Sequence, residues 1–311
     1  MIENFRQLIR RLQKFPRPRV CVAAAAGEAA LQTVRDALNE QVAAAVLIGD
    51  QEQIWKTARR ISLDLNRVDV LSEPDPAGAV DKALQLIGRG EAEVLMRGQV
   101  DVAGFLAAAA GRGGAGKKKA LSYLFAYEVP GYDRLLFVTG GGINPDPGFP
   151  EKIVILKSAV TFLQSLGVAE PKVAILSANE KVNLKMPLTV EAQQLAKAGR
   201  ELLPGALLEG PVALDVAVSK EAARQKGIKS PVAAQADLLF APNLEVGHIL
   251  GEAIVHFARG KAAAVVLGAP VPLVLARRDE EPFSRLCSLA LACFAAARQK
   301  KRNGEPASAF G

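Results

Sequence analysis

The sequence is poor in cysteine, histidine and aromatic residues. Its 311 residues include three cysteines and two histidines, and aromatic residues make up 5% of the total. The cysteines do not form a Cys-x-x-Cys pair, so neither a disulfide scaffold nor a cysteine-ligated metal centre is expected. Two histidines are too few for a histidine-rich metal site, and scarce aromatic rings leave few platforms on which single-stranded bases stack. We therefore expect reduced thiols, no metal and no nucleic-acid partner.

Long apolar runs are also absent. No stretch reaches the roughly 18 uncharged apolar residues that a membrane-spanning helix needs. The alanine clusters at 23–26 and 107–110 are much shorter. The first fifteen residues carry charges among their apolar positions, which a signal peptide does not. The sequence therefore predicts a cytoplasmic protein that does not bind a membrane.

Positive charge is in modest excess. The 39 lysines and arginines outnumber the 32 acidic residues and give a formal net charge of +7. Part of this excess lies near the two ends, at residues 6–19 and 298–302. Each of these runs is typical of the solvated face of a helix. A basic surface nevertheless favours a polyanionic small molecule as ligand.

The sequence does contain a regular alternation of short apolar runs and amphipathic segments. The runs at 20–26 and 43–48, for example, are each followed by a segment with helical spacing. This alternation is typical of parallel sheets with helices on both faces. We therefore predict an α/β fold with two domains and mostly parallel sheets. The predicted domains are residues 1–145 together with 285–311, and residues 146–284.

The glycine-rich segments do not match known phosphate-binding motifs. Residues 111–118 resemble a P-loop, but Lys118 stands where a P-loop has serine or threonine, and a predicted helix precedes the segment. We expect a mobile basic surface loop there. Gly140 to Gly142 lack the spacing of a dinucleotide-binding fingerprint. These segments therefore predict no nucleotide site.

Segments that follow predicted strands are better candidates, because open α/β sheets bind ligands at the carboxyl ends of their strands. Each such segment combines a small or turn residue with a cationic or amide group. Together they predict a cleft for a phosphorylated anion. They are residues 96–98, 180–189, 241–248 and 277–278.

A series of motifs runs in a recognisable order through most of the chain. They are MRG (96–98), PKVAILSANEKVNLKMPLTVEA (171–192), EGPVALDVAVS (209–219), KGI (226–228), ADLLFAPNLEVGHIL (236–250), VVLGAPVPLVL (265–275) and SLALA (288–292). This order resembles the phosphate acetyltransferase and phosphate butyryltransferase family, and the butyryl branch more closely.

The resemblance implies a fold, a reaction and an assembly. The fold is the two-domain isocitrate/isopropylmalate dehydrogenase type, with the active site in a cleft between the domains. The reaction exchanges a butyryl or acetyl group between coenzyme A and inorganic phosphate to give an acyl phosphate. Coenzyme A is then a substrate, and no metal or other cofactor takes part. The implied assembly is a homodimer or a higher homo-oligomer.

The resemblance also implies roles for individual residues. Arg278 matches the arginine of the family's Ser-Arg motif, which implies a ligand for phosphate or for the oxyanion. Arg97 takes the place of the lysine in Met-Lys-Gly and keeps its charge, so it is the second implied catalytic residue. Arginine suits phosphate because its planar fork donates two hydrogen bonds. The residues implied to bind substrate are Arg277, Asn183, Lys185, Thr189, Asp215, Asn243, Gly247 and His248.

Several positions depart from the family's motifs. Arg277 replaces a serine, Tyr123 a histidine and Gly140 an aspartate. The loss of one hydrogen-bond donor at an oxyanion site costs on the order of 100-fold in rate. Two alternatives therefore stay open. One is a non-catalytic or function-shifted paralogue that binds coenzyme A or acyl phosphate. The other is a related enzyme of the same fold, such as a dehydrogenase acting on another phosphorylated anion.

Overall fold

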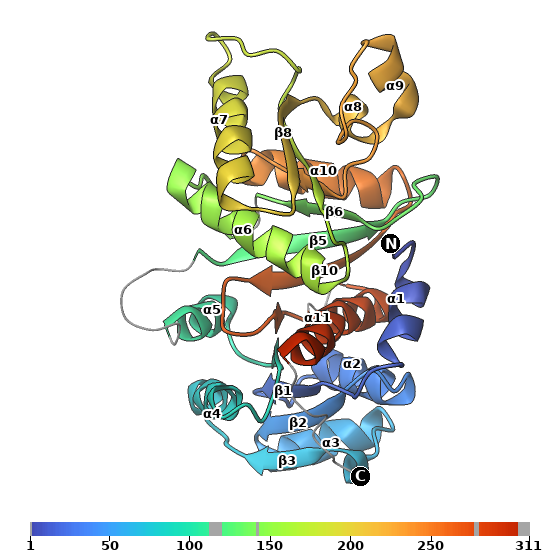
Figure 1. Cartoon of the computed structure of the whole chain (residues 1–311). Coiled ribbons are helices and arrows are strands. Elements are labelled where there is room, and N and C mark those ends of the chain that lie inside the picture. Colours follow the sequence, from blue (N-terminus) through green and yellow to red (C-terminus); the bar gives the residue numbers. More distant parts are fainter. Residues whose placement is uncertain (1, 112–119, 141–142, 277–279, 304–311) are drawn as a thin grey trace. The chain divides into compact units, whose positions relative to one another are not determined.

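The structure is a computed structural model that describes residues 2–111, 120–140, 143–276 and 280–303 (Figure 1). The chain forms two compact units. Unit 1 comprises residues 1–4 and 120–262, and unit 2 comprises residues 5–119 and 263–311. The domain borders expected from the sequence, after residues 145 and 284, differ from these. The loop expected at 111–118 lies, except for Gly111, outside the described residues.

Unit 2 is built on a mostly parallel sheet. Its strands lie in the order β3 (Asp69–Ser72), β2 (Ala44–Gly49), β1 (Arg19–Ala23), β4 (Val94–Arg97), β11 (Leu273–Val274) and β10 (Lys261–Leu267), the last of which starts in unit 1. Neighbours from β3 to β11 are parallel, and β10 runs antiparallel to β11. Most residues of β1, β2 and β4 are buried, as expected for strands covered on both faces.

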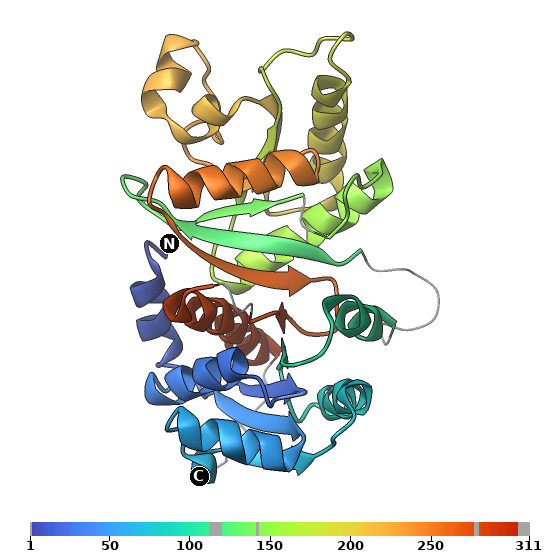
Figure 2. The ribbon, with the colours of Figure 1, turned by 180° about the vertical axis from the view of Figure 1, so that it is seen from behind.

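Helices cover both faces of this sheet. On one side lie α1 (Phe5–Leu12), α2 (Glu28–Asn39), α3 (Gln51–Arg60) and α11 (Pro282–Asn303), and on the other lie α4 (Pro76–Gly88) and α5 (Val102–Gly111) (Figures 1 and 2). A short 3₁₀ turn (Leu65–Arg67) leads into β3. Asp50 fixes the start of α3, because its carboxylate accepts a hydrogen bond from the Gln53 amide at 3.1 Å. Asp75 does the same for α4.

Unit 1 is also built on mostly parallel strands. Its strands lie in the order β5 (Ser122–Glu128), β6 (Leu136–Thr139), β9 (Leu238–Phe240), β7 (Lys172–Leu176) and β8 (Leu207–Val212). Strand β5 is antiparallel to β6, and the other neighbours are parallel. One face carries α6 (Phe149–Ser165) and α7 (Pro187–Leu202). The other carries α8 (Leu214–Val218), α9 (Lys220–Gln225) and α10 (Leu244–His256) (Figures 1 and 2).

The fold class expected from the sequence is confirmed: both units are α/β, with mostly parallel strands between helices. Strand β5 was not expected. Its residues alternate between buried and partly buried positions, as in an antiparallel strand, whereas the sequence analysis followed continuous apolar runs. Among the described residues, none of the helices combines the length and the hydrophobicity needed to cross a bilayer.

Candidate functional site

The predicted site residues follow the carboxyl ends of parallel strands. In unit 2, the parallel strands β1, β4 and β11 end side by side, so Arg97 and Leu275 lie at one edge of the sheet. In unit 1, β9, β7 and β8 are parallel neighbours. The segments that contain Asn243, Asn183 and Asp215 follow these three strands. Each set therefore occupies the edge where open α/β sheets bind their ligands.

Arg97 ends β4, and its guanidinium is held by backbone carbonyls. One terminal nitrogen donates to the carbonyl oxygens of Val100 at 2.7 Å and of Gly98 at 3.4 Å, and the other donates to Leu275 at 3.4 Å. Gly98 lets this turn pack against the backbone after β1, because a Cβ there would overlap the carbonyl oxygen of Ala24. Arg97 thus joins the turn after β4 to the segment after β11. Arg277 and Arg278, which follow that segment, lie outside the described residues.

The loop after β7 and the first turn of α7 hold the next three predicted residues. The buried hydroxyl of Thr189 donates to the carbonyl of Met186 at 2.7 Å and accepts from the amide of Asn183 at 2.9 Å. The side-chain oxygen of Asn183 accepts from the amide of Lys185, also at 2.9 Å. The buried Thr189 therefore fixes the backbone of the loop through these hydrogen bonds, whereas Asn183 and Lys185 are exposed on the loop.

Asp215 begins α8 and forms an ion pair that the sequence analysis missed. Its carboxylate lies 2.9 Å from the amine of Lys226, which also lies 2.8 Å from Glu180 in the loop after β7. The hydrogen bond from Lys226 holds the pKa of Asp215 below its ordinary value, and Glu180 and Asp215 raise the pKa of Lys226. Lys226 thus brings Asp215 and the loop after β7 together. Lys226 could have been identified from the sequence, because it is the first residue of the KGI motif.

Asn243 is the N-cap of α10. Its side-chain oxygen accepts a hydrogen bond from the amide of Val246 at 3.1 Å, which fixes the first turn. The side-chain amide nitrogen makes no hydrogen bond to the described residues, so it is available to an anionic ligand. Gly247 continues the same turn, and His248 is exposed on the helix. The structure therefore supports Asn243 as a donor more directly than its two neighbours.

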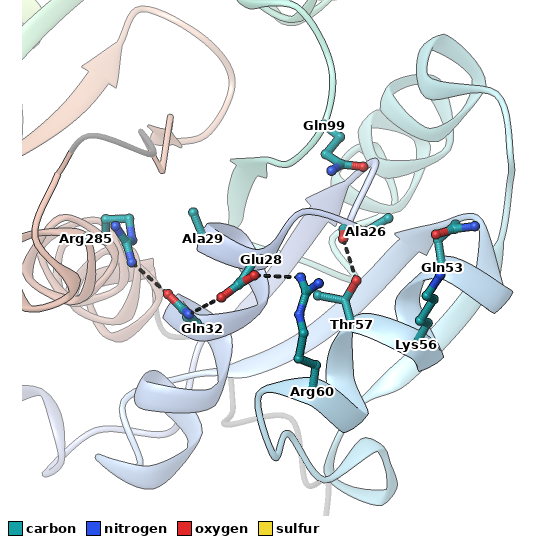
Figure 3. Close-up of a pocket in the computed structure, with 10 residues that line it drawn as sticks. All are labelled: Ala26, Glu28, Ala29, Gln32, Gln53, Lys56, Thr57, Arg60, Gln99 and Arg285. Carbon is teal, nitrogen blue, oxygen red and sulfur yellow. Dashed lines mark hydrogen bonds and ion pairs between the residues drawn. The ribbon is translucent and has the colours of Figure 1, made fainter.

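A polar pocket lies at the strand-end edge of unit 2, and sequence reasoning missed it. It has a volume of about 560 Å³ (Figure 3). It shares Ala29 and Gln99 with an adjoining pocket of about 240 Å³ that Arg97 lines. No sequence motif marks it, because its lining residues come from α2, α3, α11 and the segments after β1 and β4. The lining residues are Ala26, Glu28, Ala29, Gln32, Gln53, Lys56, Thr57, Arg60, Gln99 and Arg285.

The cysteines are poor nucleophiles in this structure. All three, Cys21, Cys287 and Cys293, are buried. Burial raises the pKa of Cys21 to about 12 and also raises that of Cys293, so both thiols stay protonated near neutral pH. Among the described residues, no group of three or more His, Cys, Asp and Glu side chains is arranged to hold a metal ion.

Comparisons with known proteins cover nearly the whole chain. Residues 77–279 match the family model described as "Phosphate acetyl/butaryl transferase". The chain is 35% identical over 302 residues to the phosphate butyryltransferase of Clostridium beijerinckii, which covers 96% of this chain and 100% of that protein. It is 39% identical over 257 residues to the phosphate acetyltransferase of Rhizobium meliloti, with 82% and 81% covered. A branched-chain phosphotransacylase from Enterococcus faecalis V583 superimposes with a TM-score of 0.78 at 27% identity, covering 90% of this chain and 99% of that one.

Proposed function

Because the chain belongs to the phosphate acetyl/butyryl transferase family, we propose that it exchanges a butyryl or acetyl group between coenzyme A and inorganic phosphate. The observation that carries this proposal is the 35% identity to a phosphate butyryltransferase over the full length of that relative. The reaction uses coenzyme A as a substrate and needs no further cofactor. The non-catalytic alternative has no comparable support, because the named relatives are acyltransferases.

The reaction needs charge stabilisation rather than a protein nucleophile. A phosphate oxygen attacks the thioester carbonyl, an oxyanion forms, and its collapse breaks the carbon–sulfur bond. The products are the acyl phosphate and the coenzyme A thiolate, which takes up a proton. Fixed cations stabilise the oxyanion and the incoming phosphate, and holding both substrates removes much of the entropic barrier. We assign the ligand of phosphate or oxyanion to Arg278.

Arg97, the second residue that the resemblance implies to be catalytic, is assigned a role in positioning the segment after β11, which precedes Arg278 in the sequence. Its terminal nitrogens hold the carbonyls of Val100 and Leu275, and Leu275 is three residues before Arg278. Arg97 therefore supports the segment from which Arg278 extends. In unit 1, the exposed Asn183 and Lys185 and the half-buried Asn243 supply amide and amine groups at the strand-end edge for the substrate's phosphates. Thr189 and Asp215 act through them, by shaping the loop after β7. Arg277, Gly247 and His248 complete the proposed substrate contacts.

Three further features are part of the proposal. The enzyme works as a homodimer or a higher homo-oligomer, it is cytoplasmic, and nucleic acids and membranes are not among its partners. Size-exclusion chromatography with light scattering measures the first of these. The basic and amide side chains of the described strand-end loops suit small phosphorylated substrates.

The test is an assay of thiol release from butyryl-CoA and acetyl-CoA with and without phosphate. We expect phosphate-dependent release by the wild type and its loss in Arg278→Ala. Arg97→Gln should lower kcat by roughly 100-fold through misplacement of the segment after β11, with partial recovery in Arg97→Lys. Calorimetry with coenzyme A accompanies the assay. A folded wild type that binds coenzyme A but transfers no acyl group contradicts the proposal and favours the non-catalytic alternative.

A further inference from the structure

The pocket of about 560 Å³ in unit 2 is lined on one side by a buried arginine that has no counter-charge among the residues that the structure describes. Arg285 on α11 is 4% exposed. Its guanidinium donates to the carbonyl of Glu280 and, at 3.1 Å, to the side-chain oxygen of Gln32. Its Nε atom is buried and has no hydrogen-bond partner, and none of the described carboxylates forms an ion pair with it. Buried charge is costly unless it is paired, so this site favours an anion.

A second cation stands on the opposite side of the pocket. Lys56 on α3 makes no hydrogen bond or ion pair with the described residues, and its amine is free to bind a ligand (Figure 3). Arg60, one turn further along α3, pairs with Glu28 on α2 at 2.6 Å. Three cations thus line the pocket against one carboxylate, which leaves an excess of two positive charges.

The other lining residues and the volume of the pocket indicate which kind of anion would fit. Gln53 and Gln99 add side-chain amides, and the ring of a nucleobase would find no aromatic partner among the lining residues. A volume of about 560 Å³ is far larger than inorganic phosphate requires and lies within the range of small-molecule sites. We propose that this pocket binds a phosphorylated small molecule and recognises it by its phosphate groups, which Arg285 and Lys56 hold from opposite sides.

Two kinds of molecule could supply the phosphate groups that this pocket recognises. One is the phosphate-bearing end of coenzyme A, since the pocket adjoins the smaller one that Arg97 lines; this source rests on the proposed function. The other is a free phosphorylated effector that binds independently of the acyl transfer. Both sources require the same cationic walls, so one set of variants tests the site and a kinetic measurement separates the sources.

The first experiment measures binding by calorimetry on the full chain, with pyrophosphate and adenosine 3′,5′-bisphosphate as probes. We expect Lys56→Ala to weaken both by about tenfold, the effect of one charge-assisted hydrogen bond. Gln32→Glu places a carboxylate beside Arg285 without removing it, and should weaken both probes by a similar factor. Arg59→Ala is the matched control, because it removes the same charge from the neighbouring turn of α3 outside the pocket.

The second experiment measures KM for butyryl-CoA and for phosphate in the same variants. If coenzyme A is the source, Lys56→Ala and Gln32→Glu raise KM for butyryl-CoA alone, and adenosine 3′,5′-bisphosphate competes with it. If the source is a free effector, both KM values stay unchanged while the binding of the probes is weakened. An inert wild type that still binds the probes through Lys56 contradicts the proposed function but supports this site. Probes that do not bind the wild type, together with unchanged KM values in both variants, overturn the inference.

Discussion

The two units differ in the partners of a buried or nearly buried arginine. In unit 1, Arg134 contacts two carboxylates, those of Asp133 at 2.7 Å and Asp237 at 3.3 Å. Asp237 is 2% exposed and also accepts a hydrogen bond from the amide of Lys172 at 2.9 Å. In unit 2, the buried Arg285 contacts only a carbonyl and a side-chain amide among the described residues. Arg134 is therefore paired with carboxylates of its own unit, whereas Arg285 has no carboxylate partner in the described part of its unit.

The position of each arginine on its sheet explains the difference. Asp237 directly precedes β9, and Lys172 begins β7. The cluster around Asp237 therefore lies at the amino-terminal ends of the unit 1 strands. Arg285 lines a pocket at the carboxyl-terminal edge of the unit 2 sheet, where open α/β sheets bind ligands. A fully paired cluster contributes to stability, whereas an incompletely paired one retains charge for a ligand.

The largest effect on stability is expected at Asp237. Asp237→Ala removes the partner of a buried amide and of Arg134, and should lower the free energy of unfolding by about 3–5 kcal/mol. Urea unfolding followed by circular dichroism measures the loss. Asp133→Ala is the matched control, because Asp133 contacts the same arginine with an exposed side chain; its cost should stay below about 1 kcal/mol. Equal losses in both variants would remove the distinction between a buried cluster and a surface pair.

The pH dependence of stability gives a smaller effect at the same residue. Burial raises the pKa of Asp237 above its ordinary value of 3.8, although Lys172 and Arg134 oppose this shift. The native state then binds the proton more tightly than the unfolded chain, so the contribution of Asp237 is largest in acid and is lost as pH rises through the folded pKa. Relative to Asp237→Asn, the unfolding free energy of the wild type should therefore fall as pH rises from below 3.8. Urea titrations of both proteins across this range measure it, and a rising difference would show that the ion pair with Arg134 dominates.

Much of the fold was predictable because its strands are short apolar runs between helices. The run at 20–26 contains most of β1, and the run at 43–48 nearly matches β2. Strand β5 was missed because its burial alternates. The cluster around Asp237 was not predictable either, because Arg134, Lys172 and Asp237 are far apart in the sequence and meet only through strand pairing.

The candidate site was predictable to the extent that it follows strand ends. That rule identified Arg97 and the loop with Asn243, both of which the structure places at a carboxyl-terminal edge. It did not identify the carbonyl partners that occupy Arg97. Nor did it identify the pocket of Arg285, whose contact with Gln32 joins residues 253 positions apart. Periodicity indicates which face of a helix is buried, but not which residue from another element meets it.

The smallest effect is expected at the strand-end edge of unit 1, where the pair of Asp215 and Lys226 is exposed enough to leave stability unchanged. Lys226→Met should raise the pKa of Asp215 toward its ordinary value, because the hydrogen bond from Lys226 is the main cause of its lowering. Carboxyl NMR titration of the labelled protein measures this pKa. Lys181→Met, which removes an exposed charge from the loop after β7, is the control and should leave it unchanged. If Lys226→Met lost as much stability as Asp237→Ala, the paired charges at this edge would also contribute to stability. The contrast between a stabilising amino-terminal edge and a ligand-binding carboxyl-terminal edge would then be wrong.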